Sequence, residues 1–115
     1  MPKAMATLKP LTFLGSSLDD LRNMPESVRH AIGVELMIVQ LGGVPGDFKA
    51  MQLVGVGAYE LRVRDAAGAF RAVYVTKFAD AIYVLHAFQK KTPKTSKSDL
   101  DLARQRYKLI PGANP

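Results

Sequence analysis

The sequence contains no cysteine, which excludes disulfide scaffolds, thiolate zinc sites, iron–sulfur clusters and cysteine nucleophiles. The two histidines, His30 and His86, are far apart in the chain, so a histidine-rich metal site is not expected. No apolar run approaches the roughly 20 residues that a membrane-spanning helix needs, and the N-terminus lacks the apolar stretch of a secretory signal. We therefore expect a cytoplasmic domain that holds no metal or other cofactor and has no membrane partner.

The rest of the composition is typical of a globular protein. The chain has 115 residues, of which 48% are hydrophobic and 23% are charged. This length suits one domain and leaves no room for two. We expect a single domain over residues 1–115, with a core from about residue 8 to about residue 110 and flexible tails.

Acidic residues are scarce in the second half of the chain. Residues 1–61 carry five lysines and arginines against six acids, whereas residues 62–115 carry eleven against four. The excess charge of +6 therefore lies in the C-terminal half. A one-sided basic field indicates a polyanionic partner such as nucleic acid, or an acidic protein. A merely solubilising surface is an equal alternative on charge alone.

Turn residues divide the first half of the chain into a short strand and two helices. The strand is expected over residues 8–14. Ser17 with Asp20 resembles a capping box and predicts a helix from about residue 18, which Pro25 ends because a proline restricts the residue before it. Pro25 also suits the first turn of a second helix, which Gly42 and Gly43 stop. The buried stripe of that second helix is predicted to be Val28, Ile32, Leu36 and Val39.

The second half of the chain changes to the period of strands. Apolar and polar residues alternate over residues 59–64, a turn follows at residues 65–68, and residues 70–78 return as the second strand of a hairpin. Residues 82–90 form a third, central strand. Ser98 is expected to cap a last helix, whose buried side would be Leu100, Ala103, Tyr107 and Ile110. The predicted order is strand, two helices, three-stranded meander and helix, which is an α+β fold.

Charged residues of this meander are predicted to share one sheet face. They are Glu60, Arg62 and Arg64 from the first strand, Arg71 from its partner, and His86, Lys90 and Lys91 from the third. Such a set suits phosphodiester chemistry without a metal, because cations neutralise the charge of the transition state while a carboxylate, an imidazole or a lysine moves protons. The alternative is that Glu60 only pairs with an arginine on a solvated face.

Three runs of this meander carry a resemblance to a known family. They are Tyr59-Glu60-Leu61-Arg62-Val63, the run from Gly68 to Tyr74, and Leu85-His86-Ala87-Phe88-Gln89-Lys90-Lys91-Thr92-Pro93-Lys94-Thr95. The order resembles the RelE/ParE toxin superfamily, and most closely its phage-derived HigB-like branch, over roughly residues 12–109. The resemblance implies a RelE-like α+β fold, with a small mostly antiparallel sheet, an N-terminal helical hairpin on one face and a C-terminal helix.

The same resemblance implies the toxin of a type II toxin–antitoxin pair. Such a toxin cuts mRNA on the ribosome by attack of a ribose 2′-hydroxyl, without a metal, and its partners are a helix-turn-helix antitoxin, the ribosome and mRNA. Glu60 is then the candidate general base, with His86 behind it. The basic catalytic positions would be Arg62, Arg71, Lys90 and Lys91, and the RNA-binding residues would be Tyr59, Arg64, Lys94 and Lys97. Buried packing is the alternative for Tyr59.

Two other functions compete with the nuclease. One is a non-catalytic toxin of the ParE type that binds DNA gyrase, and the other is a basic nucleic-acid-binding accessory protein of phage origin. The set of Arg62, Arg71, Lys90 and Lys91 favours the nuclease. HigB-like members commonly leave the active face exposed in the complex, so the antitoxin is expected to dock on the near-neutral helical hairpin.

Overall fold

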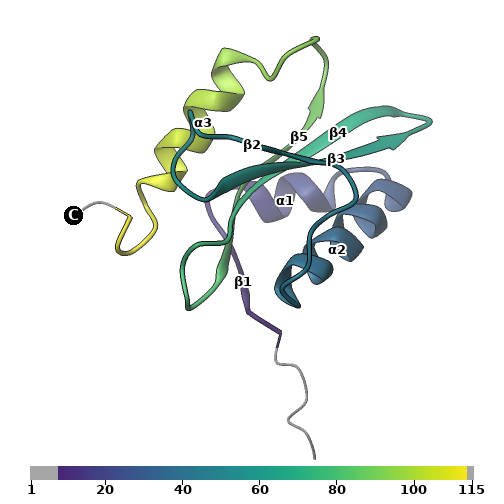
Figure 1. Ribbon diagram of the computed structural model, residues 1–115. Helices are drawn as coiled ribbons and strands as arrows, with labels where there is room; N and C mark the ends of the chain where they lie inside the picture. Colours follow the sequence, from purple (N-terminus) through teal and green to yellow (C-terminus); the bar gives the residue numbers. More distant parts are fainter. Residues whose placement is uncertain (1–7, 114–115) are drawn as a thin grey trace, which may run out of the picture.

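A five-stranded sheet with helices on both faces forms the described part of the chain (Figure 1). The computed structural model describes residues 8–113, so the expected tails lie largely outside the described residues. In chain order the elements are β1 (Leu11–Phe13), α1 (Ser17–Arg22), α2 (Glu26–Gln40), β2 (Phe48–Ala50), β3 (Ala58–Asp65), β4 (Gly68–Val75), β5 (Ile82–Lys90) and α3 (Lys97–Tyr107).

The sheet has the order β1-β5-β4-β3-β2. β1 runs parallel to β5, and the other neighbours are antiparallel. The expected meander is therefore confirmed, as are the bounds of β5. β1 is shorter than predicted, since it covers residues 11–13, and β4 is shifted, since it begins two residues before and ends three residues before the predicted 70–78. β2 was not predicted, because its three residues are all exposed and show no alternation.

The helical hairpin of α1 and α2 covers one face of the sheet. The predicted stripe of α2 is confirmed, since Val28, Ile32, Leu36 and Val39 are all buried. These side chains pack against strand residues of the same face, such as Leu61 and Ala72. This face is mainly apolar and supplies packing energy, which leaves the opposite face of the sheet for polar side chains.

α3 packs on the opposite face of the sheet. On this side β5 contains an irregularity in its pairing with β4. Tyr74 pairs with Val84 whereas Val73 pairs with His86, so Leu85 is an extra residue of the kind found in a β-bulge. Leu85 joins the core on the α3 side, while Val84 belongs to the core on the hairpin side. The predicted buried side of α3 is confirmed, since Ala103, Tyr107 and Ile110 are buried and Leu100 packs against them.

The two helix caps differ slightly from the predictions. Ser16, not Ser17, precedes α1, and the buried hydroxyl of Ser17 donates instead to the carbonyl oxygen of Val84. Ser96, not Ser98, caps α3, and its Oγ accepts a hydrogen bond from the backbone N–H of Asp99. Among residues 8–113, no helix has the length and apolar character needed to cross a membrane.

Arg106 fastens α3 to the irregular part of β5. Its side chain is buried, and one terminal nitrogen donates to the carbonyl oxygen of Leu85 at 2.9 Å. The other donates to Oγ of Ser16 at 3.0 Å, just before α1. Gly15 leaves room for this guanidinium, because a Cβ there would lie 2.3 Å from Nε of Arg106. One arginine thus joins three elements that are distant in sequence.

We predict that Arg106→Leu lowers the free energy of unfolding by about 1–3 kcal/mol, because the carbonyl of Leu85 would stay buried without a donor. Arg104→Leu is the matched control on the exposed side of the same helix, and it should change stability by less than about 0.5 kcal/mol. Urea unfolding followed by circular dichroism measures both variants. Equal stability of the two would contradict this role of Arg106.

Candidate functional site

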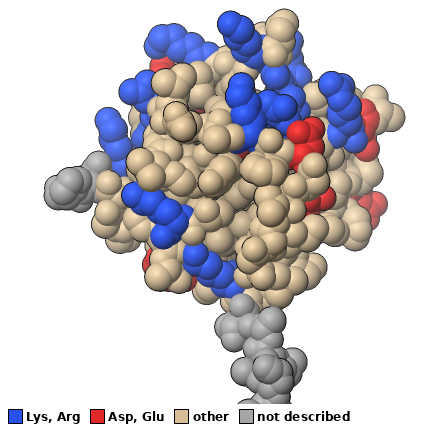
Figure 2. Space-filling view, viewed as in Figure 1, with Lys and Arg blue, Asp and Glu red and all other residues tan. Residues whose placement is uncertain are grey.

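The register of the sheet brings cations together on the face that carries α3. Residues directly opposite each other in antiparallel strands share a face. Arg62 lies opposite Arg71, and Lys49 lies opposite Glu60. Arg64 and Lys90 both pair with Ala69, one from each side. The resulting cluster, called here the cationic face, consists of Glu60 and the cations Lys49, Arg62, Arg64, Arg71 and Lys90. In Figure 2, lysine and arginine side chains gather in the upper part of the view, around the ends of these strands and the loop before α3.

Glu60 lies at the centre of the cationic face and is only 1% exposed. Its Oε1 is 3.3 Å from Nε of Arg71 and 3.7 Å from Nε of Arg62. Its Oε2 accepts a hydrogen bond of 2.7 Å from Oγ1 of Thr95. A buried carboxylate is costly unless it is paired. The two arginines and the threonine hydroxyl meet that need, so both oxygens of Glu60 are engaged.

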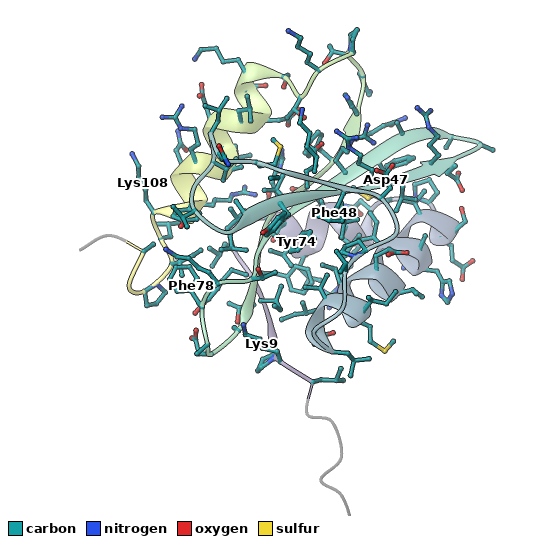
Figure 3. All side chains as sticks on the ribbon, in the orientation of Figure 1. Lys9, Asp47, Phe48, Tyr74, Phe78 and Lys108 are labelled. Carbon is teal, nitrogen blue, oxygen red and sulfur yellow. The ribbon has the colours of Figure 1, made fainter. Side chains whose placement is uncertain are left out.

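Arg71 is the deepest cation of the cluster, at 6% exposure. Burial lowers the pKa of its guanidinium, while the carboxylate of Glu60 acts in the opposite direction. The group stays charged at neutral pH, as arginines do in proteins. Its NH1 donates to the carbonyl oxygen of Phe70 at 3.2 Å. Arg62 is more accessible, and its NH1 lies 3.9 Å from the carboxylate of Asp47 at the beginning of β2 (Figure 3).

Both arginines hold a donor without a hydrogen-bond acceptor. Across residues 8–113, the buried side-chain polar atoms that lack a hydrogen bond are Nε of Arg62, Nε of Arg71 and Nδ1 of His86. Buried donors in folded proteins are nearly always paired, so an exception calls for a physical explanation. Both Nε atoms are inaccessible to solvent and lie within 3.7 Å of Oε1 of Glu60, so ion pairs with this carboxylate take the place of hydrogen bonds.

A groove of about 560 Å³ opens over this cluster. Its polar lining includes Lys49, Glu60, Arg62, Lys90, Lys94 and Thr95. Its apolar lining includes Met51, Leu53, Pro93 and Leu100. Its volume lies within the range of ordinary small-ligand sites. The lining thus combines charged side chains with apolar ones.

Lys90 lines the same groove and carries a shifted amine pKa. Partial burial lowers the pKa of its amine, and the positive charge of Arg71 lowers it further, while Glu60 opposes the shift. A lowered pKa makes a larger fraction of the amine neutral near physiological pH. A neutral amine can accept a proton, as a general base must.

His86 lies on the same face but is engaged elsewhere. Its ring is buried, stacks on Phe88 with 4.7 Å between centroids, and has Nε2 only 2.7 Å from Oδ1 of Asp99 in α3. It is not among the residues that line the groove. The structure therefore pairs His86 of β5 with the first turn of α3 and does not bring this second candidate for proton transfer into the groove.

The other predicted residues fall into two groups. Lys94 lines the groove, and Arg64 is exposed beside it on the cationic face. Lys91 is exposed just after β5 and does not line the groove. Lys97 is exposed as well, and its Nζ donates to Asp101 one helical turn further along α3. The structure thus brings Arg64 and Lys94 to the cluster and leaves Lys91 and Lys97 at its periphery.

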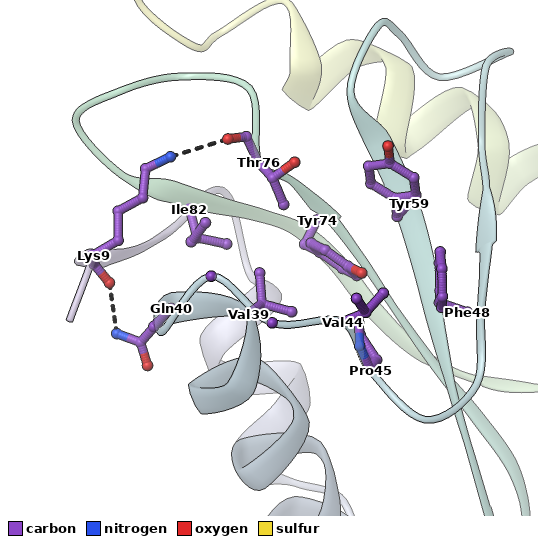
Figure 4. Close-up of a pocket in the computed structure, with 12 residues that line it drawn as sticks. Lys9, Val39, Gln40, Val44, Pro45, Phe48, Tyr59, Tyr74, Thr76 and Ile82 are labelled. Atoms are coloured by element: carbon purple, nitrogen blue, oxygen red, sulfur yellow. Dashed lines mark hydrogen bonds between the residues drawn. The ribbon is translucent and has the colours of Figure 1, made fainter. Parts of the chain in front are cut away.

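Tyr59 lies on the opposite, hairpin side of the sheet. It stacks on Tyr74 with 5.8 Å between ring centroids. Together with Phe48 and Val44, both rings line a second cavity, of about 380 Å³ (Figure 4). Burial, with smaller contributions from Tyr59 and Glu35, raises the pKa of Tyr74 to about 12. Packing, the alternative named for Tyr59, agrees with this position, which the sheet separates from the cationic face.

Sequence reasoning missed two members of the site. Lys49 could not be placed because β2 has no alternating pattern, although it lies directly opposite Glu60. Thr95 belongs to the run that carried the resemblance, but nothing in the sequence indicates its bond to a residue 35 positions away. Among residues 8–113, no three histidine, aspartate or glutamate side chains lie close enough together to hold a metal ion.

Comparisons with known proteins agree with the expected fold. Residues 19–108 match the family described as "Phage derived protein Gp49-like". Among solved structures, the chain is similar to a double arginine-to-alanine mutant of the E. coli toxin RelE in the free state. The TM-score is 0.61, and the sequences are 14% identical over 90% of this chain and 99% of that chain. No curated protein sequence matches this chain significantly. The chain therefore belongs to the Gp49-like family of phage-derived proteins and has the fold of RelE, as its resemblance to the RelE/ParE superfamily predicted.

Proposed function

We propose that this protein is the toxin of a type II toxin–antitoxin pair and cleaves mRNA on the ribosome, in the cytoplasm and without a metal. The observation that supports this proposal most directly is the pair of opposed arginines at the buried Glu60, of which Arg62 lines the groove and Arg71 is buried beside it. The RelE fold and the Gp49-like family add support, since both occur among phage-derived and toxin proteins.

In this proposal the positive charge of the arginines stabilises the phosphate that is cut. Arg62 lines the groove and donates from its terminal N–H groups to one of the non-bridging oxygens, and Arg71, which is buried beside it, adds a second preorganised charge; the groove accommodates the neighbouring nucleotide. Negative charge increases on these oxygens as the phosphorus becomes five-coordinate. Preorganised donors that stabilise such charge contribute most of the rate enhancement in many enzymes. Glu60 holds both guanidinium groups in place from below.

The chemical step needs one proton acceptor near the groove. The ribose 2′-oxygen attacks the adjacent phosphorus, and the bond from phosphorus to the 5′-oxygen breaks, which leaves a 2′,3′-cyclic phosphate and a 5′-hydroxyl. The neutral amine of Lys90 takes the 2′-hydroxyl proton, and water protonates the leaving 5′-oxygen. We assign this role to Lys90 because both oxygens of Glu60, the general base expected from the sequence, are already engaged.

We predict that Arg71→Ala lowers kcat for mRNA cleavage on ribosomes by roughly 100-fold, because one preorganised charge contact to the transition state is lost. Arg64→Ala, the exposed neighbour on the same face, should mainly raise KM. Arg71→Lys retains the charge and tests whether the paired donors of arginine are required. Full activity of a folded Arg71→Ala protein, or inhibition of gyrase supercoiling without any mRNA cleavage, would contradict the proposed function.

Replacing Lys90 by arginine should separate charge from proton transfer. Arginine keeps the positive charge but is not deprotonated in proteins. We predict that Lys90→Arg binds RNA normally and loses roughly 100-fold in kcat. In the wild type, kcat should rise with pH through the lowered pKa of Lys90, since only the neutral amine accepts a proton. Lys94→Arg, in the same groove, should keep that profile. An unchanged pH profile in Lys90→Arg would contradict the assignment to Lys90.

We further propose that a helix-turn-helix antitoxin docks on the hairpin and leaves the cationic face open. Val34, Met37 and Leu41 are exposed at helical spacing at the end of α2 and give an apolar surface away from the cations. The association rate should then change little between about 50 and 500 mM salt, because charge attraction is not used. Met37→Asp should weaken binding. A steep fall in rate with salt, with loss of binding in an Arg62→Ala/Arg71→Ala double variant, would indicate the cationic face instead.

A further inference from the structure

The loop between β5 and α3 reaches across the groove to the central carboxylate. Thr95, in this loop, donates its hydroxyl to Oε2 of Glu60 at 2.7 Å. Within residues 8–113, Thr95 is the residue that donates a hydrogen bond to this carboxylate. Arg62 and Arg71 contact the carboxylate as ion pairs, and their Nε groups make no hydrogen bond. The direction of the Glu60 carboxylate therefore depends on a residue outside the sheet.

The position of Thr95 is itself fixed by its neighbour Ser96. The Oγ of Ser96 accepts a hydrogen bond from the backbone N–H of Asp99 and donates to Oδ2 of the same residue at 2.7 Å. The other carboxylate oxygen of Asp99 lies 2.7 Å from Nε2 of His86. His86 is buried in β5 and stacks on Phe88. The loop is thus tied to the sheet immediately after Thr95.

These contacts form one continuous path between two strands of the sheet. It begins at His86 on β5, passes through Asp99 and Ser96 at the start of α3, and returns through Thr95 to Glu60 on β3. A β-branched side chain such as threonine has few χ1 rotamers, so a fixed backbone also fixes its hydroxyl. The loop can therefore hold the carboxylate in one orientation, which determines how the two arginines are presented.

We propose that Thr95 is a positioning residue of the groove, and that the anchor formed by His86, Asp99 and Ser96 keeps it in place. Its hydroxyl turns Oε1 of Glu60 toward Arg62 and Arg71, so that the two ion pairs hold both guanidinium groups in one position beside the groove. Thr95 acts on cleavage through Glu60 and the two arginines. The effect on cleavage rests on the function proposed above, whereas the effect on the arginines does not.

The test compares four proteins, which are the wild type, Thr95→Val, Thr95→Ser and Thr92→Val. Valine keeps the shape of threonine and removes the donor, while serine keeps the donor. Thr92 is the matched control, since it is exposed in the same loop and its hydroxyl bonds to the carbonyl oxygen of Lys94. Two quantities are measured in each protein: kcat and KM for cleavage of a ribosome-bound mRNA, and the NMR signals of the Nε–H groups of Arg62 and Arg71.

We expect Thr95→Val to lose between about 10-fold and 100-fold in kcat with little change in KM, because small misplacements of catalytic groups reduce the rate strongly. It should also shift both arginine signals. Thr95→Ser should restore both quantities, and Thr92→Val should leave them unchanged. Thr95→Val should also lower the midpoint of thermal unfolding, because the buried Oε2 of Glu60 loses its donor, whereas Thr95→Ser and Thr92→Val should keep the wild-type midpoint.

A folded Thr95→Val protein with wild-type kcat and unshifted arginine signals would overturn the proposal, as would a Thr95→Ser protein that behaves like Thr95→Val. If the wild type cuts no mRNA and Thr95→Val still shifts the arginine signals, the positioning of Glu60 by Thr95 is supported and the proposed cleavage function is contradicted. The two proposals can therefore fail separately.

Discussion

The pairing of Arg62 with Arg71 is the physical constraint on which the cationic face depends. Like charges directly opposite each other on antiparallel strands are destabilising. Here the carboxylate of Glu60, one position along the same face of β3, lies within 3.7 Å of both Nε atoms and offsets their repulsion. Glu60 is itself buried and would be costly without them. Each of the three charges is therefore stabilised by the others, and the register of β3 and β4 sets their positions.

The two faces of the sheet differ in composition: one carries the helical hairpin, and the other carries α3 and the cations. On the hairpin side, α2 and strand residues form a mainly apolar core, which provides packing. On the other side α3 packs over part of the sheet through Ala103 and Tyr107, and the ends of β3, β4 and β5 extend beyond it (Figure 1). That uncovered part carries the cations. The hydrogen bond from Arg106 to the carbonyl oxygen of Leu85 holds α3 in a position that leaves this part of the sheet uncovered.

Period-two alternation and turn residues predicted most of the sheet and the main members of the site. Alternation over β3 places Glu60, Arg62 and Arg64 on one face, and the short turn after Asp65 brings Arg71 opposite Arg62, as found. Helical spacing predicted the buried side of α2 equally well. These features are local, so the sequence determines them without knowledge of the tertiary structure.

What the sequence did not predict arises from contacts between distant segments. β2 is held to β3 by pairing alone and has no pattern of its own, so Lys49 was missed. His86 was placed on the correct face, but its bond to Asp99 depends on how α3 packs. The bond from Thr95 to Glu60 likewise joins a loop to a strand that is far away in the chain.

The most direct test of the central claim is to locate bound RNA on the protein. A short single-stranded RNA with a 2′-deoxyribose at the cut position cannot be cleaved, so its complex can be followed by NMR. The account predicts that the largest shifts occur in the Nε–H signals of Arg62 and Arg71 and in the loop around Thr95. Shifts confined to α2 and to the cavity beside Tyr59 and Tyr74, with the two arginines unchanged, would contradict it.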